Sequence, residues 1–317
     1  MQGPIFQSVA LTLWGNAVLL SADRGGLTPI GSVLPADHST RRDCASIRFV
    51  TLHPDGKRWQ EQVYADTPEQ WLTRLRSEGV TRLRLHYLST PPDTVTGAPH
   101  APPQPDAAPD SQPRGERWLI EAAHPGGSDI WQGRWHRGPG EATAALPEHL
   151  WTDRIWSATY GRIAQGFRPP PVDLIHPVRL HDSLSDTVQG CLALARRHDH
   201  LRAVTLFDLA LRKLTSQTPE AGLTYPDLLP PSAPEADTLP ARRLLACAQM
   251  LWDTARDPLP AEPPATMTAE EWADWATLHH TLRQGLIQAV LYAANREPVF
   301  DRTAGTTGRW RRWWPFR

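Results

Sequence analysis

The sequence predicts an α+β protein, in which a mainly antiparallel sheet domain with one helix (residues 1–165) precedes an α-helical bundle domain (residues 182–297). Three observations support this prediction. Apolar and polar residues alternate with a period of two in most segments before residue 165. Apolar residues recur with helical spacing after residue 182, and a Pro-rich stretch at 166–181 interrupts both patterns. A basic aromatic tail, residues 298–317, follows the second domain.

The first half of the chain opens with predicted strands. Residues 8–20 are almost wholly apolar and are interpreted as a strand. Residues 46–53 and 58–65 flank the sequence PDG, whose Pro and Gly supply the dihedral angles of a turn. These two segments therefore predict a β-hairpin.

One helix is predicted in the sheet domain. Thr67 can cap its start, Pro68 suits the first helical position, and Gln70 occupies the third position of a capping box. Gly79 can end the helix, because glycine tolerates the left-handed conformation found after many helices.

Further strands complete the predicted sheet. Residues 81–88 alternate, residues 117–123 and 129–137 form a second hairpin around HPGG, and residues 155–160 give a last strand. Residues 91–115, rich in Pro, Ala and Asp, bury too little apolar surface to offset their ordering entropy. We therefore expect a flexible insertion between two strands of one domain.

Four amphipathic helices are predicted after residue 182. Ser183 with Asp186 can cap the first of them, and Thr268 with Glu271 forms a capping box for the fourth. Their apolar stripes cover residues 184–195, 201–214, 244–252 and 272–293. Helices of this kind with polar outer faces predict a small antiparallel bundle.

The charge of the chain is unevenly distributed. The formal net charge is −1, from 33 basic and 34 acidic side chains. Residues 301–317 carry five arginines and one aspartate, a net +4, which leaves −5 for residues 1–300. Such an asymmetry is typical of chains with an interaction segment.

The cysteines and the N-terminal segment bear on the cellular location. Cys44, Cys191 and Cys247 are odd in number, far apart and without metal-ligand spacing, which supports neither a disulfide framework nor a zinc site. Residues 9–20 have no positive leader and are shorter than a membrane span. We expect a cytoplasmic protein with no transmembrane segment, no metal and no cofactor.

Catalytic signatures are few. The sequence contains no GxxxxGK[ST], GxGxxG, GxSxG or HExxH motif. The candidates for catalysis are His38, Arg41, Arg42 and Cys44 in the segment DHSTRRDCAS. If this segment lined a pocket, the two arginines could lower the thiol pKa and make Cys44 a nucleophile. The alternative is a polar loop from which Cys44 enters the core.

One face of a predicted strand carries cationic side chains. Arg82, Arg84 and His86 alternate with apolar residues, and Arg134 and His136 can join them from another strand. Such a face could bind phosphate or an acidic partner through charge-assisted hydrogen bonds. The alternative is the solvated side of an antiparallel sheet.

Tryptophans are concentrated in the second half of the sheet domain. They are Trp118, Trp131, Trp135, Trp151 and Trp156. On a surface they would suggest stacking on sugars or bases, but the alternation of Trp131 and Trp135 with polar residues favours burial on one face.

The last ten residues, GRWRRWWPFR, combine positive charge with aromatic rings. The candidate binding residues are Arg309, Trp310, Arg311, Arg312, Trp313, Trp314, Phe316 and Arg317. The composition resembles short membrane-active peptides and suits an anionic membrane surface. It also suits nucleic acid, with arginines for phosphates and indoles for stacking. A third interpretation is that the aromatic rings pack on the acidic body.

These observations lead to three functional hypotheses. The first is a non-enzymatic cytoplasmic protein that binds a membrane or a protein partner through the tail. The second is an enzyme whose pocket lies between sheet and helices and uses Cys44, or a histidine, with Arg41 or Arg42. The third is a nucleic-acid-binding protein that uses the tail and the face of Arg82, Arg84 and His86.

Overall fold

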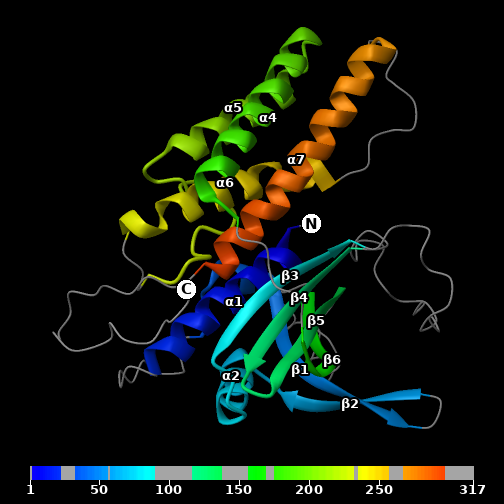
Figure 1. Cartoon of the computed structure of the whole chain (residues 1–317), viewed down its shortest axis with the longest axis vertical. Coiled ribbons are helices and arrows are strands. Elements are labelled where there is room, and N and C mark those ends of the chain that lie inside the picture. Colours follow the sequence, from blue (N-terminus) through cyan, green and yellow to red (C-terminus); the bar gives the residue numbers. More distant parts are fainter. Residues whose placement is uncertain are drawn as a thin grey trace, which may run out of the picture.

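A six-stranded sheet forms one layer of the molecule, and α1 lies between this sheet and a bundle of four helices (Figure 1). The computed structural model describes residues 2–22, 33–55, 58–89, 116–137, 156–168, 175–231, 235–256 and 267–296. The elements are α1 (Gly3–Ala22), η2 (Ser39–Arg41), β1 (Cys44–Asp55), β2 (Arg58–Ala65), α2 (Pro68–Ser77), β3 (Arg82–Ser89), β4 (Glu116–His124), β5 (Gly127–Arg137), β6 (Trp156–Phe167), α4 (Pro177–Arg197), α5 (Leu201–Thr215), α6 (Glu235–Arg256) and α7 (Ala269–Asn295). The predicted α+β class is confirmed.

The sheet is mixed. Its order is β2-β1-β6-β5-β4-β3, and every neighbouring pair is antiparallel except β1 and β6, which are parallel. The two predicted hairpins are present as β1–β2 and β4–β5. Parallel neighbours require a long connection, and β6 comes last in the chain but pairs with the first strand.

The prediction of a strand at residues 8–20 is wrong, because this segment belongs to helix α1. Its apolar residues show no period of two, and a helix that is apolar all round is buried on all sides. The window Gly3–Leu20 is long and apolar enough to cross a membrane, but 78% of it is buried inside the protein. The hydroxyls of Ser8 and Thr12 donate to the helix's own carbonyls, which satisfies them in this apolar setting.

Two predicted helix starts are confirmed. The Thr67 hydroxyl accepts a hydrogen bond from the Gln70 backbone N–H, and Pro68 occupies the first turn of α2. Thr268 and Glu271 form the capping box of α7, with each side chain bound to the other's backbone N–H. Both signals depend on residues within one turn, so they require no tertiary information.

Two helices of the bundle begin earlier than predicted. Helix α4 begins at Pro177 with His176 as its cap, and not at the predicted cap Ser183. Helix α6 begins at Glu235 and contains Pro240. Pro240 is the sixth residue of α6 and lies beyond the N–H groups that lack a helical partner, so its missing N–H removes one hydrogen bond, to the carbonyl of residue 236.

The outer edge of strand β3 is paired with two asparagine side chains. Asn16 of α1 accepts from the Leu83 N–H at 2.7 Å and donates to the Leu83 carbonyl at 2.8 Å. Asn295 of α7 does the same for Leu85, at 2.7 and 2.8 Å. The two amides thus take the place of a seventh strand for these residues. Because α7 also packs on α1, one continuous core joins sheet and bundle, and the predicted division into two domains stays a prediction.

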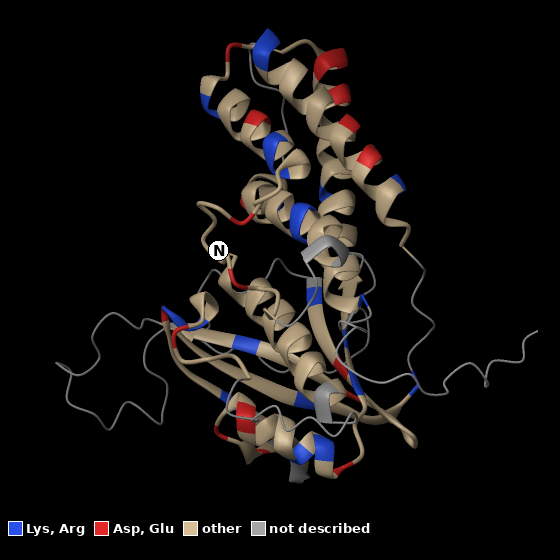
Figure 2. Cartoon of the chain, turned by 90° about the vertical axis from the view of Figure 1, so that its left-hand side faces the viewer, with Lys and Arg blue, Asp and Glu red and all other residues tan. Residues whose placement is uncertain are grey.

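Aromatic side chains fill the core between the sheet and its helices. Phe49 stacks on Trp71 of α2 at 4.4 Å, and Trp131 contacts both rings edge-on. Trp118 and Trp131 are buried, so core packing is confirmed for these two tryptophans, whereas Trp151 lies outside the described residues. Helix α1 carries no charged residue, and the charged side chains gather on other elements (Figure 2).

Candidate functional site

The segment that sequence analysis selected for catalysis forms a short 3-10 turn, η2, directly before the first strand. His38 caps this turn: its Nδ1 accepts from the Thr40 N–H at 3.2 Å and lies 2.9 Å from the Thr40 hydroxyl. Its Nε2 lies 2.9 Å from the carbonyl oxygen of Asp227. Since Nδ1 accepts, the imidazole proton resides on Nε2 and is donated to Asp227.

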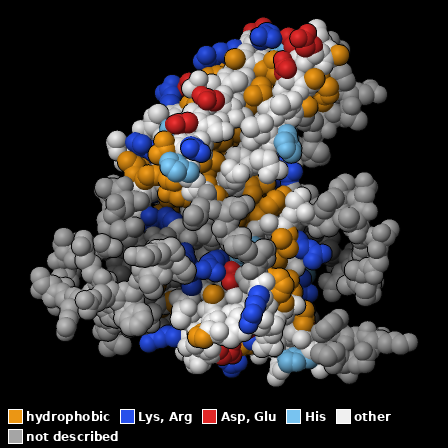
Figure 3. All heavy atoms as spheres, viewed as in Figure 1, with side chains coloured by type: hydrophobic (Ala, Val, Ile, Leu, Met, Phe, Trp, Pro, Cys, Tyr) orange, Lys and Arg blue, Asp and Glu red, His pale blue; other side chains and the backbone are white. Residues whose placement is uncertain are grey.

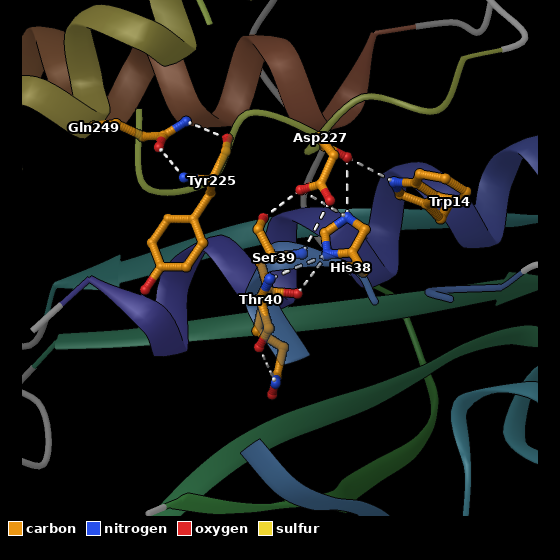
Figure 4. Close-up of polar contacts among 8 residues, drawn as sticks. Trp14, His38, Ser39, Thr40, Tyr225, Asp227 and Gln249 are labelled. Atoms are coloured by element: carbon orange, nitrogen blue, oxygen red, sulfur yellow. Dashed lines mark hydrogen bonds and ion pairs between the residues drawn. The ribbon is translucent and has the colours of Figure 1, made fainter. Parts of the chain in front are cut away.

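Asp227 joins this turn to the connection between α5 and α6. Its carboxylate accepts hydrogen bonds from the Ser39 hydroxyl and, at 2.9 Å, from the Ser39 N–H. The indole N–H of Trp14 donates to its carbonyl at 3.3 Å, so α1 takes part as well. Figure 4 shows Asp227 in contact with Ser39, His38 and Trp14 together. No local pattern in the sequence points to Asp227, which lies in a Pro-rich connection far from His38 in the chain.

The environment of His38 does not suit a general base. Burial lowers its pKa below the ordinary value of 6.5, and this effect exceeds the opposing charge of Asp227. Both ring nitrogens are engaged within the fold. His38 therefore acts as a neutral structural group.

The two arginines of the segment differ in their surroundings. Arg41 donates to the Leu34 carbonyl at 2.8 Å and lies 3.9 Å from the carboxylate of Glu69. Arg42 follows the 3-10 turn, where its backbone N–H donates to the Ser39 carbonyl, and its side chain is exposed. Neither of these contacts involves the thiol of Cys44.

Cys44 is the first residue of β1, where it pairs with Trp156 of β6. It is 6% exposed, and its thiol donates to the Ser46 carbonyl at 3.2 Å. Burial raises the pKa of the thiol above its ordinary value of 9.0. The hydrogen bonds from Gln7 and nearby backbone groups and the charge of Arg41 act to lower that pKa, as predicted for Arg41, but burial outweighs them. The thiol is therefore protonated at neutral pH and is a poor nucleophile.

Cys44 lines a cavity of about 230 Å³ between α1, η2 and the ends of the central strands. The lining consists of Gly3, Pro4, Gln7, Ser39, Thr40, Asp43, Cys44, Trp135, Trp156 and Tyr225. The cavity thus lies between sheet and helices, where the enzyme hypothesis places a pocket. His38 is not among the lining residues.

Gln7 is the polar centre on the inner side of this cavity. It is 2% exposed, and its Oε1 accepts from the Trp135 indole N–H and the Tyr160 hydroxyl, both at 3.2 Å. Its Nε2 donates to the Thr40 carbonyl at 3.3 Å. The Gln7 amide therefore fixes the orientation of Trp135. Sequence analysis missed Gln7, which directly precedes the segment mistaken for a strand.

The predicted cationic face of the sheet is organised around an acid that sequence analysis did not select. Glu121 of β4 is 1% exposed and accepts from Ser128 at 2.6 Å. His86 lies 2.6 Å and Arg84 3.4 Å from its carboxylate. Burial acts to raise the pKa of Glu121, but the hydrogen bonds and charges around it outweigh burial and lower that pKa.

The other cationic residues of this prediction are distributed elsewhere. Arg82 donates to the Asn295 carbonyl at 2.9 Å, at the end of α7. Arg134 forms an ion pair with Glu61. Arg84 lies at one side of an open groove of about 410 Å³ that also contains His124 and Arg168. The structure thus brings Arg84 and His86 together around the carboxylate of Glu121.

The tail residues 309–317 lie outside the described residues. In the parts of the chain that the structure does describe, no group of three or more His, Cys, Asp or Glu is placed to hold a metal ion. On the face shown in Figure 3, charges of both signs are interspersed over the helical bundle.

No protein-family model, curated protein or solved structure matches this chain. The candidate sites are therefore argued from their geometry and chemistry alone.

Proposed function

We propose that this chain is a non-enzymatic cytoplasmic binding protein that contacts an anionic membrane surface through its Arg/Trp-rich tail. The observation that carries the proposal is that the predicted catalytic groups have structural partners within the fold. His38 binds Thr40 and Asp227, Arg41 binds Leu34, and Cys44 donates to Ser46. Both imidazole nitrogens are bound to protein groups and burial keeps the thiol of Cys44 protonated, which supports a structural role for these residues.

The thiols support the same proposal. Burial raises the pKa of Cys191 and of Cys247 to about 12, and it raises that of Cys44 as well. All three cysteines are buried and without a disulfide partner. They are small apolar residues of the core rather than reactive thiolates.

The composition of the tail favours an anionic surface. Residues 308–317 contain four arginines, three tryptophans and a phenylalanine. Each arginine near an anionic bilayer contributes about 1 kcal/mol, and indole rings prefer the headgroup level. Because residues 1–300 carry a net charge of −5, attraction to such a surface is concentrated in the tail.

The proposal is tested by comparing the full chain with a version that ends at Pro298. Both are mixed with anionic vesicles, neutral vesicles and single-stranded DNA, and binding is measured by co-sedimentation. We expect the full chain alone to bind anionic vesicles, with affinity that falls as salt increases. A third version, with the four tail arginines replaced by glutamine, should lose anionic binding while keeping its aromatic residues.

Two outcomes would redirect the proposal. Binding of DNA in preference to vesicles, with strong salt dependence, would support the nucleic-acid hypothesis instead. Equal behaviour of the full and shortened chains on all three surfaces would contradict a role of the tail in binding.

An enzyme remains the second candidate, because Cys44 lines a cavity between sheet and helices. This candidate requires a reactive thiolate, and the rate at which Cys44 is alkylated discriminates between the two functions.

A further inference from the structure

The cavity that contains Cys44 has a lining that is unusual in its aromatic content. Trp135 comes from β5, Trp156 from the start of β6, and Tyr225 from the connection between α5 and α6. Pockets for drug-sized ligands measure about 300–1,000 Å³, so a cavity of about 230 Å³ suits a smaller molecule. Three rings around so small a volume place aromatic surface close to any ligand.

Most polar groups of the lining already have partners in the protein. The amide of Gln7 binds Trp135, Tyr160 and Thr40, and the Ser39 hydroxyl binds Asp227. By contrast, neither the carboxylate of Asp43, which is exposed, nor the half-buried Tyr225 hydroxyl makes a hydrogen bond or ion pair with a described residue. A carboxylate, a phenol and aromatic rings thus remain to contact a ligand.

The charges differ between the two sides of the cavity. Burial raises the pKa of Tyr225, and the carboxylates of Asp43 and Asp253 raise it further, whereas the guanidinium of Arg42 acts in the opposite direction. At the Tyr225 hydroxyl the two carboxylates outweigh the one guanidinium, whereas the charge of Arg41 acts on the Cys44 thiol elsewhere in the lining. The charges therefore favour a cation on the Tyr225 side of the cavity, next to Asp43.

Packing holds the aromatic residues in place before a ligand binds. The Trp135 indole lies against Gly133, where the Cβ of any other residue would overlap the ring. The Tyr225 backbone is held by Gln249, which accepts from its N–H at 3.1 Å and donates to its carbonyl at 2.9 Å (Figure 4). Preorganised rings lose little conformational entropy on binding.

We propose that this cavity binds a small organic cation with a methylated ammonium group. The rings of Trp135, Trp156 and Tyr225 would contact its methyl groups, and Asp43 would balance its charge. Aromatic rings attract cations through the negative charge of their faces, and methylated ammonium groups have a weak hydration shell to lose. This inference concerns the body of the protein and is independent of the function proposed for the tail.

Choline chloride is the probe for the test, with its neutral isostere, in which carbon replaces the quaternary nitrogen, as the matched ligand. Both are titrated into the isotope-labelled full chain, and the indole N–H signals are followed by NMR. We expect choline to shift the signals of Trp135 and Trp156, and the isostere to bind about tenfold more weakly. Ethanolamine, which lacks the methyl groups, should also bind more weakly.

Variants separate the contributions to binding. Asp43→Asn should weaken choline about tenfold and leave the isostere unchanged, whereas Asp186→Asn, on the exposed side of α4, should change neither. Trp156→Leu should weaken choline to a similar extent and Trp156→Phe should retain it, which distinguishes a lost ring from a disturbed fold.

Three results would overturn the inference. Equal affinity for choline and its isostere would show an apolar site, and no shift of the Trp135 and Trp156 signals with either probe would show no site. Loss of the choline response in the version that ends at Pro298 would place the cation on the tail tryptophans. If the version that ends at Pro298 keeps the choline response, the cavity binds choline without the tail, and this conclusion does not depend on the result of the vesicle experiment.

Discussion

Replacement of Asn295 by alanine should destabilise the protein by removing both hydrogen bonds between α7 and the edge of β3. In the native chain, Asn295 accepts from the Leu85 N–H and donates to the Leu85 carbonyl. Leu85 is fully buried, so water replaces the lost amide only if α7 moves away from the strand. The backbone carbonyl of Asn295, which binds Arg82, is unaffected by the substitution.

The expected size of the effect follows from these contacts. Each neutral hydrogen bond contributes about 0.5–1.5 kcal/mol net, and a buried group left without a partner costs about 1–3 kcal/mol. The substitution leaves the backbone N–H and the carbonyl of Leu85 without their partner, and water can replace that partner only in part. We therefore expect Asn295→Ala to lower the free energy of unfolding by about 2–4 kcal/mol. Such a loss is a large fraction of the stability of an ordinary domain.

The measurement is urea unfolding followed by tryptophan fluorescence, together with hydrogen exchange at the Leu85 amide. Thr277→Ala is the matched control on α7, since the Thr277 hydroxyl donates only within its own helix, to Ala273. The control should cost less than about 0.5 kcal/mol. A similarly small effect for Asn295→Ala, with the Leu85 amide still protected from exchange, would refute the role assigned to this side chain.

Three further predictions follow from buried contacts. Gly15→Ala would place a Cβ 2.5 Å from the side chain of Leu83. Although alanine favours a helix more than glycine does, we expect this overlap to lower the free energy of unfolding in urea by about 1 kcal/mol. A gain in stability would contradict the close packing of α1 on β3. Burial lowers the pKa of His38 in the folded protein, so the imidazole of the unfolded chain takes up a proton at a higher pH, and the free energy of unfolding falls as the pH drops below 6.5. The difference in that free energy between the native chain and His38→Gln should therefore shrink from about pH 7.5 to about pH 5.5. A difference that stays constant would argue against a buried neutral imidazole. The pKa of Glu121 is lowered in the folded protein, so its carboxylate stabilises the fold above pH 4.5 and this stabilisation disappears as the pH falls. Glu121→Gln should therefore have a lower free energy of unfolding than the native chain at neutral pH, and a similar one in acid. If the variant stays equally destabilised in acid, the charge of Glu121 is not the cause.

Local signals in the sequence were sufficient for much of the fold. The caps at Thr67 and Thr268, both hairpins and the existence of the four bundle helices depend on residues close together in the chain. The segment 8–20 was misread because an apolar helix buried on every side has the same composition as a buried strand. The parallel pairing of β1 with β6 had no local signal at all.

The polar contacts were harder to predict, because their partners are distant in the chain. His38 was selected, but its partner Asp227 lies 189 residues away, so a structural role could not be distinguished from a catalytic one. Glu121 did leave a signal, as the single acid within an otherwise apolar segment of β4. Asn16 and Asn295 are the only asparagines in the sequence, and their placement in apolar stretches of helix was a second signal.

The rate at which iodoacetamide alkylates Cys44, measured across pH and resolved by mass spectrometry, tests most directly the claim that the predicted catalytic segment is structural. We predict slow modification at neutral pH, slower than for the same cysteine in the urea-unfolded chain, with an inflection above 9.0. Rapid modification of Cys44 at neutral pH, with an inflection below about 7, would contradict the claim and favour an enzyme.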